Sequence, residues 1–98
     1  MNRAETLQIL TQNAAAIRAY GATALHLFGS AARDEMRPDS DVDLFIDYDP
    51  ASGFDYFAFC RIEDLVQTVL GREIDLTTRS GLHPSLRERI EKSSVRVF

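Results

Sequence analysis

The stretch that most constrains the fold of this chain is residues 41–48, DVDLFIDY, in which polar and apolar side chains alternate. In an extended strand, successive side chains point to opposite faces of the sheet. One face would carry Val42, Leu44 and Ile46, and the other would carry Asp41, Asp43, Phe45 and Asp47. The pattern predicts a strand whose apolar face is covered by another layer of the protein.

The residues before this strand predict a helix followed by a second strand. One helical stripe is formed by Leu7, Leu10, Ala14 and Ile17. Gly21 suits the left-handed position that follows a helix end. The short apolar run at 24–28, which stops at Gly29, is typical of a buried strand.

The residues after the strand at 41–48 predict a loop at 49–53, a helix over about 55–70 closed by Gly71, and a strand at 73–78. Pro84 suits the first turn of a last helix. This order predicts an α/β (α+β) fold, a small mixed sheet with helices mainly on one face.

Composition limits the class of protein. With 98 residues, 45% of them hydrophobic, we expect one domain over residues 1–98. No apolar run approaches the roughly 18 residues of a membrane span, and we expect no signal peptide. The single cysteine, Cys60, excludes an internal disulfide. We therefore expect a cytoplasmic protein.

Acidic residues are concentrated in the centre of the chain. Between Asp34 and Asp55 there are eight of them, with Arg37 as the only basic residue. This argues against direct nucleic-acid binding through that region, because duplex recognition begins with neutralisation of phosphates. The acidic centre is compatible with divalent cations, or alternatively with a solvated surface that has no ligand.

Asp41 and Asp43 indicate where such a cation would bind. Residues i and i+2 of a strand point the same way, with Cα atoms roughly 6.5–7 Å apart. Aspartate is a poor strand former, so two of them at the start of an apolar strand need a reason. They predict a cation site; the alternative is a polar strand end that faces water.

Asp75 supplies a third carboxylate, between Ile74 and Leu76 in the predicted strand at 73–78. A buried aspartate without a partner is costly. If the two strands are neighbours, three carboxylates surround a site for one or two Mg²⁺ ions that also bind substrate phosphates. The alternative is a salt bridge from Asp75 to Arg72 or Arg79.

The turn at Gly29-Ser30 predicts a phosphate site. A strand that ends in glycine lets the backbone approach a ligand closely, and a short helix from Ala31 would direct free N–H groups at it. Taken alone, the same residues also suit an ordinary strand-to-helix turn. Arg33, one helical turn beyond Ser30, either contacts the phosphate or lies on the helix surface.

Gly29-Ser30, ten intervening residues and Asp41-Val42-Asp43 together resemble the signature of the polymerase-beta-like nucleotidyltransferases. The stretch GSAARDEMRPDSDVDLFID (29–47) is more closely similar to the minimal nucleotidyltransferase (MNT) group, which includes antitoxins paired with HEPN toxins. The resemblance implies that the loop at Gly29, Ser30 and Arg33 binds the nucleotide. It also implies that Asp41, Asp43 and Asp75 are catalytic and bind Mg²⁺.

The same resemblance implies an enzyme that transfers AMP from ATP to a hydroxyl, with a tyrosine of a partner HEPN ribonuclease toxin as the expected acceptor. Neither nucleic acid nor membrane is expected as a direct partner. Two alternatives stay open. One is a nucleotidyltransferase for a small molecule of the antibiotic type. The other is a non-catalytic antitoxin that acts by contact alone.

Three further features have more than one interpretation. The aromatic segment 54–59 predicts core packing, with a partner surface as the alternative. His26, between Leu25 and Leu27, predicts a packed or partly exposed histidine and no ligand. Cys60 predicts a small packed side chain.

Overall fold

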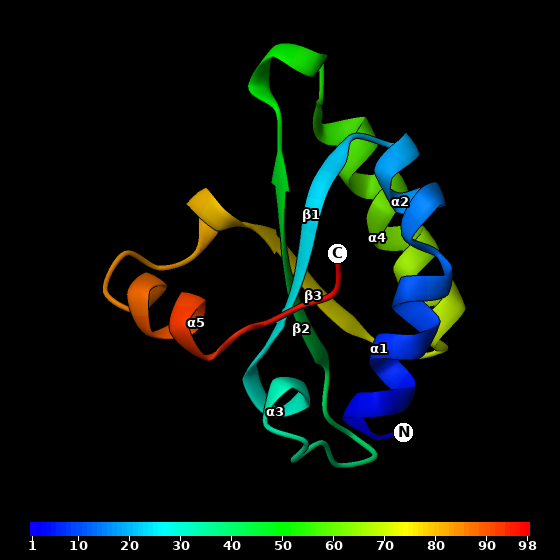
Figure 1. The fold of residues 1–98 in the computed structure, drawn as a ribbon, viewed down its shortest axis with the longest axis vertical. Coiled ribbons are helices and arrows are strands. Elements are labelled where there is room, and N and C mark those ends of the chain that lie inside the picture. Colours follow the sequence, from blue (N-terminus) through cyan, green and yellow to red (C-terminus); the bar gives the residue numbers. More distant parts are fainter.

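A four-stranded mixed sheet lies at the centre of the computed structural model, which describes all 98 residues (Figure 1). The sheet has the order β3-β2-β1-β4, with β1 (Ala22–Phe28), β2 (Val42–Tyr48), β3 (Ile74–Thr78) and β4 (Val95–Arg96). The helices are α1 (Arg3–Gln12), α2 (Ala14–Ala19), α3 (Gly29–Ala32), α4 (Tyr56–Leu70) and α5 (Arg87–Ser93). Two short 3₁₀ turns are η1 (Pro50–Ser52) and η2 (Arg79–Gly81). None of the helices has the length and apolar character needed to cross a membrane.

The connection between β2 and β3 determines which residues meet. β1 is antiparallel to β2 and to β4, whereas β2 and β3 are parallel. Parallel strands need a long crossover, and here α4 provides it. The resulting register pairs Asp43 with Asp75 and Leu44 with Leu76.

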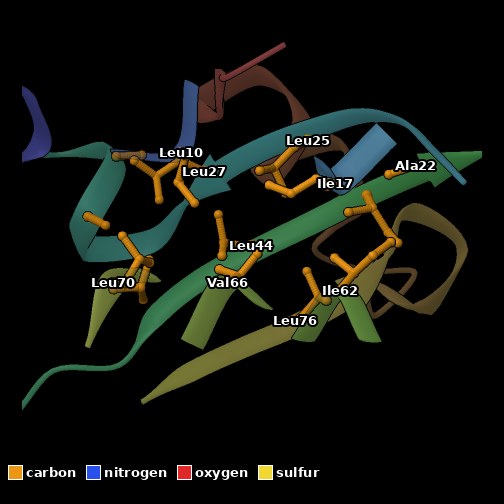
Figure 2. Packing of buried hydrophobic residues seen from close by; sticks show 14 residues of the cluster. Leu10, Ile17, Ala22, Leu25, Leu27, Leu44, Ile62, Val66, Leu70 and Leu76 are labelled. Atoms are coloured by element: carbon orange, nitrogen blue, oxygen red, sulfur yellow. The ribbon is translucent and has the colours of Figure 1, made fainter. Parts of the chain in front are cut away.

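The main core lies between the sheet and the layer formed by α1, α2 and α4, as Figures 1 and 2 show. On α4 the fully buried positions Ile62 and Val66 and the nearly buried Leu70 are spaced four residues apart, as an amphipathic helix requires. From the other elements, the core receives Leu10, Ile17, Leu25, Leu27, Leu44 and Leu76. The predicted fold, with helices mainly on one face, is confirmed.

The first helix is interrupted, contrary to the single stripe predicted from the sequence. Asn13 separates α1 from α2, and its backbone angles, φ of −106° and ψ of 10°, are not helical. The Asn13 side chain donates to the Ile9 carbonyl at 2.7 Å, a local bond that competes with the helical backbone pattern. Leu10 and Ile17 nevertheless both reach the core.

The last helix begins at Arg87, three residues later than the position of Pro84 predicted. A turn precedes it, in which the Leu86 N–H donates to the His83 carbonyl at 2.9 Å. The sequence also gave no sign of β4, because a two-residue strand is too short to show an alternating pattern.

Candidate active site

The turn after β1 lies directly against a carboxylate of β2. β1 ends at Phe28 and α3 begins at Gly29, two residues before the predicted start at Ala31. Gly29 has a φ of +68°, in the left-handed region that favours glycine. A Cβ atom at this position would overlap the Oδ2 atom of Asp43. Only glycine therefore lets the turn and this carboxylate occupy neighbouring space.

Asp43 and Asp75 are register partners on β2 and β3. Adjacent strands lie about 4.8 Å apart, and residues paired in register project from the same face of the sheet. Burial raises the pKa of the Asp43 carboxyl, and the negative charges of Asp75 and Asp41 raise it further, while Arg33 opposes them. The structure thus brings the three aspartates into one electrostatic neighbourhood.

Two details differ from the sequence-based expectation. Asp41 lies one residue before β2 and is exposed, so it is not part of the regular strand. Asp75 is exposed and not buried, because β3 is an edge strand. The predicted alternative, a salt bridge from Asp75 to Arg72 or Arg79, is wrong. Arg72 binds backbone carbonyls and Arg79 pairs with other carboxylates.

The three aspartates do not form a closed cage. No group of three or more His, Cys, Asp or Glu side chains has a geometry that would hold a metal ion by itself. Sites that bind Mg²⁺ together with substrate phosphates, however, use only one or two protein carboxylates. A bound cation would relieve the repulsion of the Asp43 carboxylate by the charges of Asp75 and Asp41. The residues present therefore suit a cation that is shared with a phosphate-bearing substrate.

A residue that the sequence analysis did not assign to the site, Arg72, holds the loop that leads to Asp41. Its Nη2 atom donates to the carbonyl oxygens of Arg37 at 2.8 Å, Pro38 at 3.2 Å and Ser40 at 2.7 Å. These carbonyls belong to the turn immediately before Asp41. Arg72 directly follows Gly71, which ends α4, and the loop that it contacts lies more than thirty residues earlier in the chain. The local sequence therefore gave no indication of these contacts.

Ser30 and Arg33 lie at the same end of the sheet as the aspartates. Ser30 is half-buried within α3. Arg33 follows α3 and is exposed, and its Nε donates to Glu35 at 3.2 Å. Its positive charge opposes the rise in the pKa of Asp43.

The face of the sheet that bears Asp43 is covered further along by an ionic network. Phe45, predicted on the polar face, is fully buried because the His26 ring stacks on it, with ring centroids 4.5 Å apart, and Arg79 lies over it. Arg79 donates to Asp47 at 2.7 and 2.9 Å and also pairs with Glu91 of α5. Burial lowers the pKa of His26, whereas Arg79 lowers that of Asp47. The network attaches the segment of η2 and α5 to this face.

The aromatic segment 54–59 divides into two pairs. Phe54 and Phe59 are half-buried and pack against the core, as predicted. Tyr56 and Phe57 are 75% and 76% exposed, so core packing is the wrong interpretation for these two rings. Cys60 is half-buried and free, and it belongs to no cluster of three or more side chains that could hold a metal ion.

The chain is similar in sequence to known proteins along most of its length. The family model described as a nucleotidyltransferase domain matches residues 11–97. Protein adenylyltransferase MntA of Thermococcus cleftensis is 29% identical over 94 residues, which cover 95% of this chain and 93% of that protein. A protein of Methanocaldococcus jannaschii, provisionally named as a protein adenylyltransferase, is 32% identical over 81% of this chain and 83% of its own length.

Solved structures also share this fold. A structure provisionally assigned as a minimal nucleotidyltransferase is 31% identical, with a TM-score of 0.74 over 95% of this chain and 89% of its own. A toxin–antitoxin complex with AMP-PNP contains a chain of the same fold at 17% identity, with a TM-score of 0.68 over 100% of this chain and 73% of that one.

Proposed function

The chain belongs to the nucleotidyltransferase domain family, as its motif predicted, and we propose that it is a Mg²⁺-dependent antitoxin that transfers AMP from ATP to a tyrosine hydroxyl of a HEPN ribonuclease toxin. Residues 1–98 serve as one catalytic domain. The observation that carries the proposal is the pairing of Asp43 with Asp75 next to the turn at Gly29.

The nucleotide would bind at the turn between β1 and α3. The Ser30 hydroxyl would donate to a phosphate oxygen, and Arg33 would approach the same group. The Arg33–Glu35 pair is exposed on both sides, and such pairs contribute about 0–1 kcal/mol. Arg33 can therefore exchange Glu35 for a phosphate at little cost.

The carboxylates would hold Mg²⁺, with Asp41 and Asp43 as its ligands and Asp75 as a further one. When bound, the metal neutralises the triphosphate and stabilises charge on the leaving pyrophosphate. The acceptor oxygen bonds to the α-phosphorus while the bond to pyrophosphate breaks, and the hydroxyl proton must leave. Asp75 either accepts this proton or helps to hold a second metal.

Two observations support a protein acceptor. Two relatives that this chain covers almost completely or to about four fifths are named, one of them provisionally, as protein adenylyltransferases, and the fold is shared with a chain of a toxin–antitoxin complex. AMP on a ribonuclease hydroxyl adds a bulky negative group that opposes binding of RNA phosphates. The acidic centre of this chain disfavours direct contact with nucleic acid, and we propose that the reaction takes place in the cytoplasm.

The experiment is intact-mass spectrometry of the toxin after incubation with this chain, ATP and Mg²⁺. We expect the toxin to gain AMP units with the wild type and none with Asp41→Asn/Asp43→Asn. If that double variant inhibits the toxin equally without a mass gain, the chain acts by contact alone. If a small hydroxylated molecule is labelled in place of the toxin, the acceptor class is wrong.

A further inference from the structure

We propose that the exposed rings of Tyr56 and Phe57, with the cavity beside them, form the surface on which a protein partner docks through an apolar anchor surrounded by lysines or arginines. We call this surface the aromatic face; it comprises Tyr48, Phe54, Tyr56, Phe57 and Phe59. The choice of partner rests on the proposed function, in which a ribonuclease toxin with an RNA-binding surface must be held during transfer.

The aromatic face has a concave part. A cavity of about 400 Å³ is lined by Tyr48, Phe54, Tyr56 and Phe59 together with Thr77 and Thr78 at the end of β3. The Tyr48 and Phe54 rings stack with centroids 4.4 Å apart. Apolar cavities with convergent polar groups are preferred positions for anchoring side chains of a partner.

The fold does not require aromatic residues at positions 56 and 57. The buried stripe of α4 runs through Ile62, Val66 and Leu70. At 100° per residue, Phe57 lies directly opposite Val66, the middle of this stripe, whereas Tyr56 lies about 80° from Val66. The Tyr56 ring stacks on Phe59, with centroids 6.4 Å apart, and stays 75% exposed. A small polar residue would serve the helix equally well at position 57, and both rings are exposed enough to be available to a partner.

The charges around the aromatic face select the chemistry of that partner. Within residues 48–64 there are four carboxylates and one basic residue, which gives a net charge of −3; the acids are Asp49, Asp55, Glu63 and Asp64, and the base is Arg61. The neighbouring Cys60 is the main cause of the raised pKa of the Tyr56 phenol, and the Glu63 charge raises this pKa further. A cationic rim on the partner complements this charge.

The same charges disfavour two other occupants. A second copy docked through the same face would bring one −3 segment against another, because a two-fold interface pairs identical surfaces. Nucleic-acid bases could stack on the rings, but their phosphates would meet the same carboxylates. The aromatic face therefore fits a basic protein surface best.

The aromatic face lies apart from the candidate active site. Tyr48 and Asp43 lie at opposite ends of β2, five residues or roughly 17 Å apart along the strand. In Figure 1 the loop before α4 and the first turn of α4 lie at the opposite end of the molecule from α3. A partner of ordinary interface size spans such a distance, so docking and transfer can be tested independently.

The test is isothermal titration calorimetry of the full chain against a HEPN-type toxin. We expect Tyr56→Ser/Phe57→Ser to weaken binding on the order of 100-fold, since buried aromatic anchors dominate interfaces. In surface plasmon resonance, Glu63→Gln/Asp64→Asn should lower the association rate and its dependence on salt. Leu86→Ser, at a residue 41% exposed on the segment before α5, is the matched control and should change neither.

The outcomes separate this proposal from the proposed function. If the aromatic double variant binds the toxin as tightly as the wild type, the docking surface is wrong, whatever the transfer assay shows. If Asp41→Asn/Asp43→Asn binds normally but transfers nothing, docking and catalysis are distinct, as expected. If the wild type binds through these rings yet never modifies the toxin, only the proposed function fails. If light scattering shows a wild-type dimer that the aromatic variant dissociates, the occupant is a second copy and the proposal is overturned.

Discussion

Replacing Asp75 with Asn should make the protein more stable while it abolishes AMP transfer. Asp43 and Asp75 are register partners on strands about 4.8 Å apart, so their carboxylates lie roughly 5–6 Å from each other. Two unit charges at that separation repel by about 0.7 kcal/mol in water and about 3 kcal/mol at an effective dielectric constant of 20. Because Asp75 is exposed, the lower part of this range applies, at about 1 kcal/mol.

A gain of about 1 kcal/mol corresponds to a Tm roughly 4–8 °C higher for a domain of this size. The sign follows from the pKa of Asp43, which is raised in the folded state. The folded protein therefore holds the Asp43 proton more tightly than the unfolded chain does, and stability falls as pH rises through that raised pKa. The advantage of Asp75→Asn should be largest at neutral pH and disappear below the unfolded-state pKa of about 3.9.

Thermal unfolding at pH 7.5 and at pH 4, followed by circular dichroism, checks this prediction. Asp39→Asn, which removes one charge from the exposed loop before β2, is the control and should change the Tm little. Addition of Mg²⁺ and AMP-PNP should stabilise the wild type more than Asp75→Asn. An unchanged or lower Tm for Asp75→Asn at pH 7.5 would refute the argument that the paired carboxylates repel each other.

Three other substitutions test the supporting residues. Gly29→Ala should cost about 1–2 kcal/mol for the left-handed backbone alone and displace Asp43; urea unfolding and a transfer assay measure both effects, and full activity would contradict the close approach. Arg72→Met should weaken metal-dependent nucleotide binding roughly 10–100-fold and speed hydrogen exchange in the loop before β2; unchanged exchange would remove its positioning role. Arg79→Met should destabilise the fold by about 1 kcal/mol at pH 7. Because Arg79 lowers the pKa of Asp47 in the folded protein, that loss should shrink as the pH falls from the unfolded-state pKa of about 3.9 through the lowered folded-state pKa. An equal loss at pH 7 and pH 3, measured by chemical denaturation, would show that the ion pair is not its source.

The sequence by itself determined most of the elements and the motif, because both depend on short-range spacing. Alternation within 41–48 specifies which side chains share a strand face, and the stripe on 55–70 specifies the buried side of α4. The glycine at position 29 and the aspartates at 41 and 43 lie within one local unit, so their likeness to a nucleotidyltransferase motif was visible without a structure.

The tertiary structure alone decided which distant residues meet. The register that pairs Asp43 with Asp75 depends on how α4 crosses over the sheet, and the exposure of Asp75 depends on β3 being an edge strand. The contacts of Arg72 with the loop before Asp41 join residues more than thirty positions apart. The burial of Phe45 required a later segment to fold over a face that looked polar. Each of these depends on chain topology and long side-chain reach, and local periodicity carries no information about either.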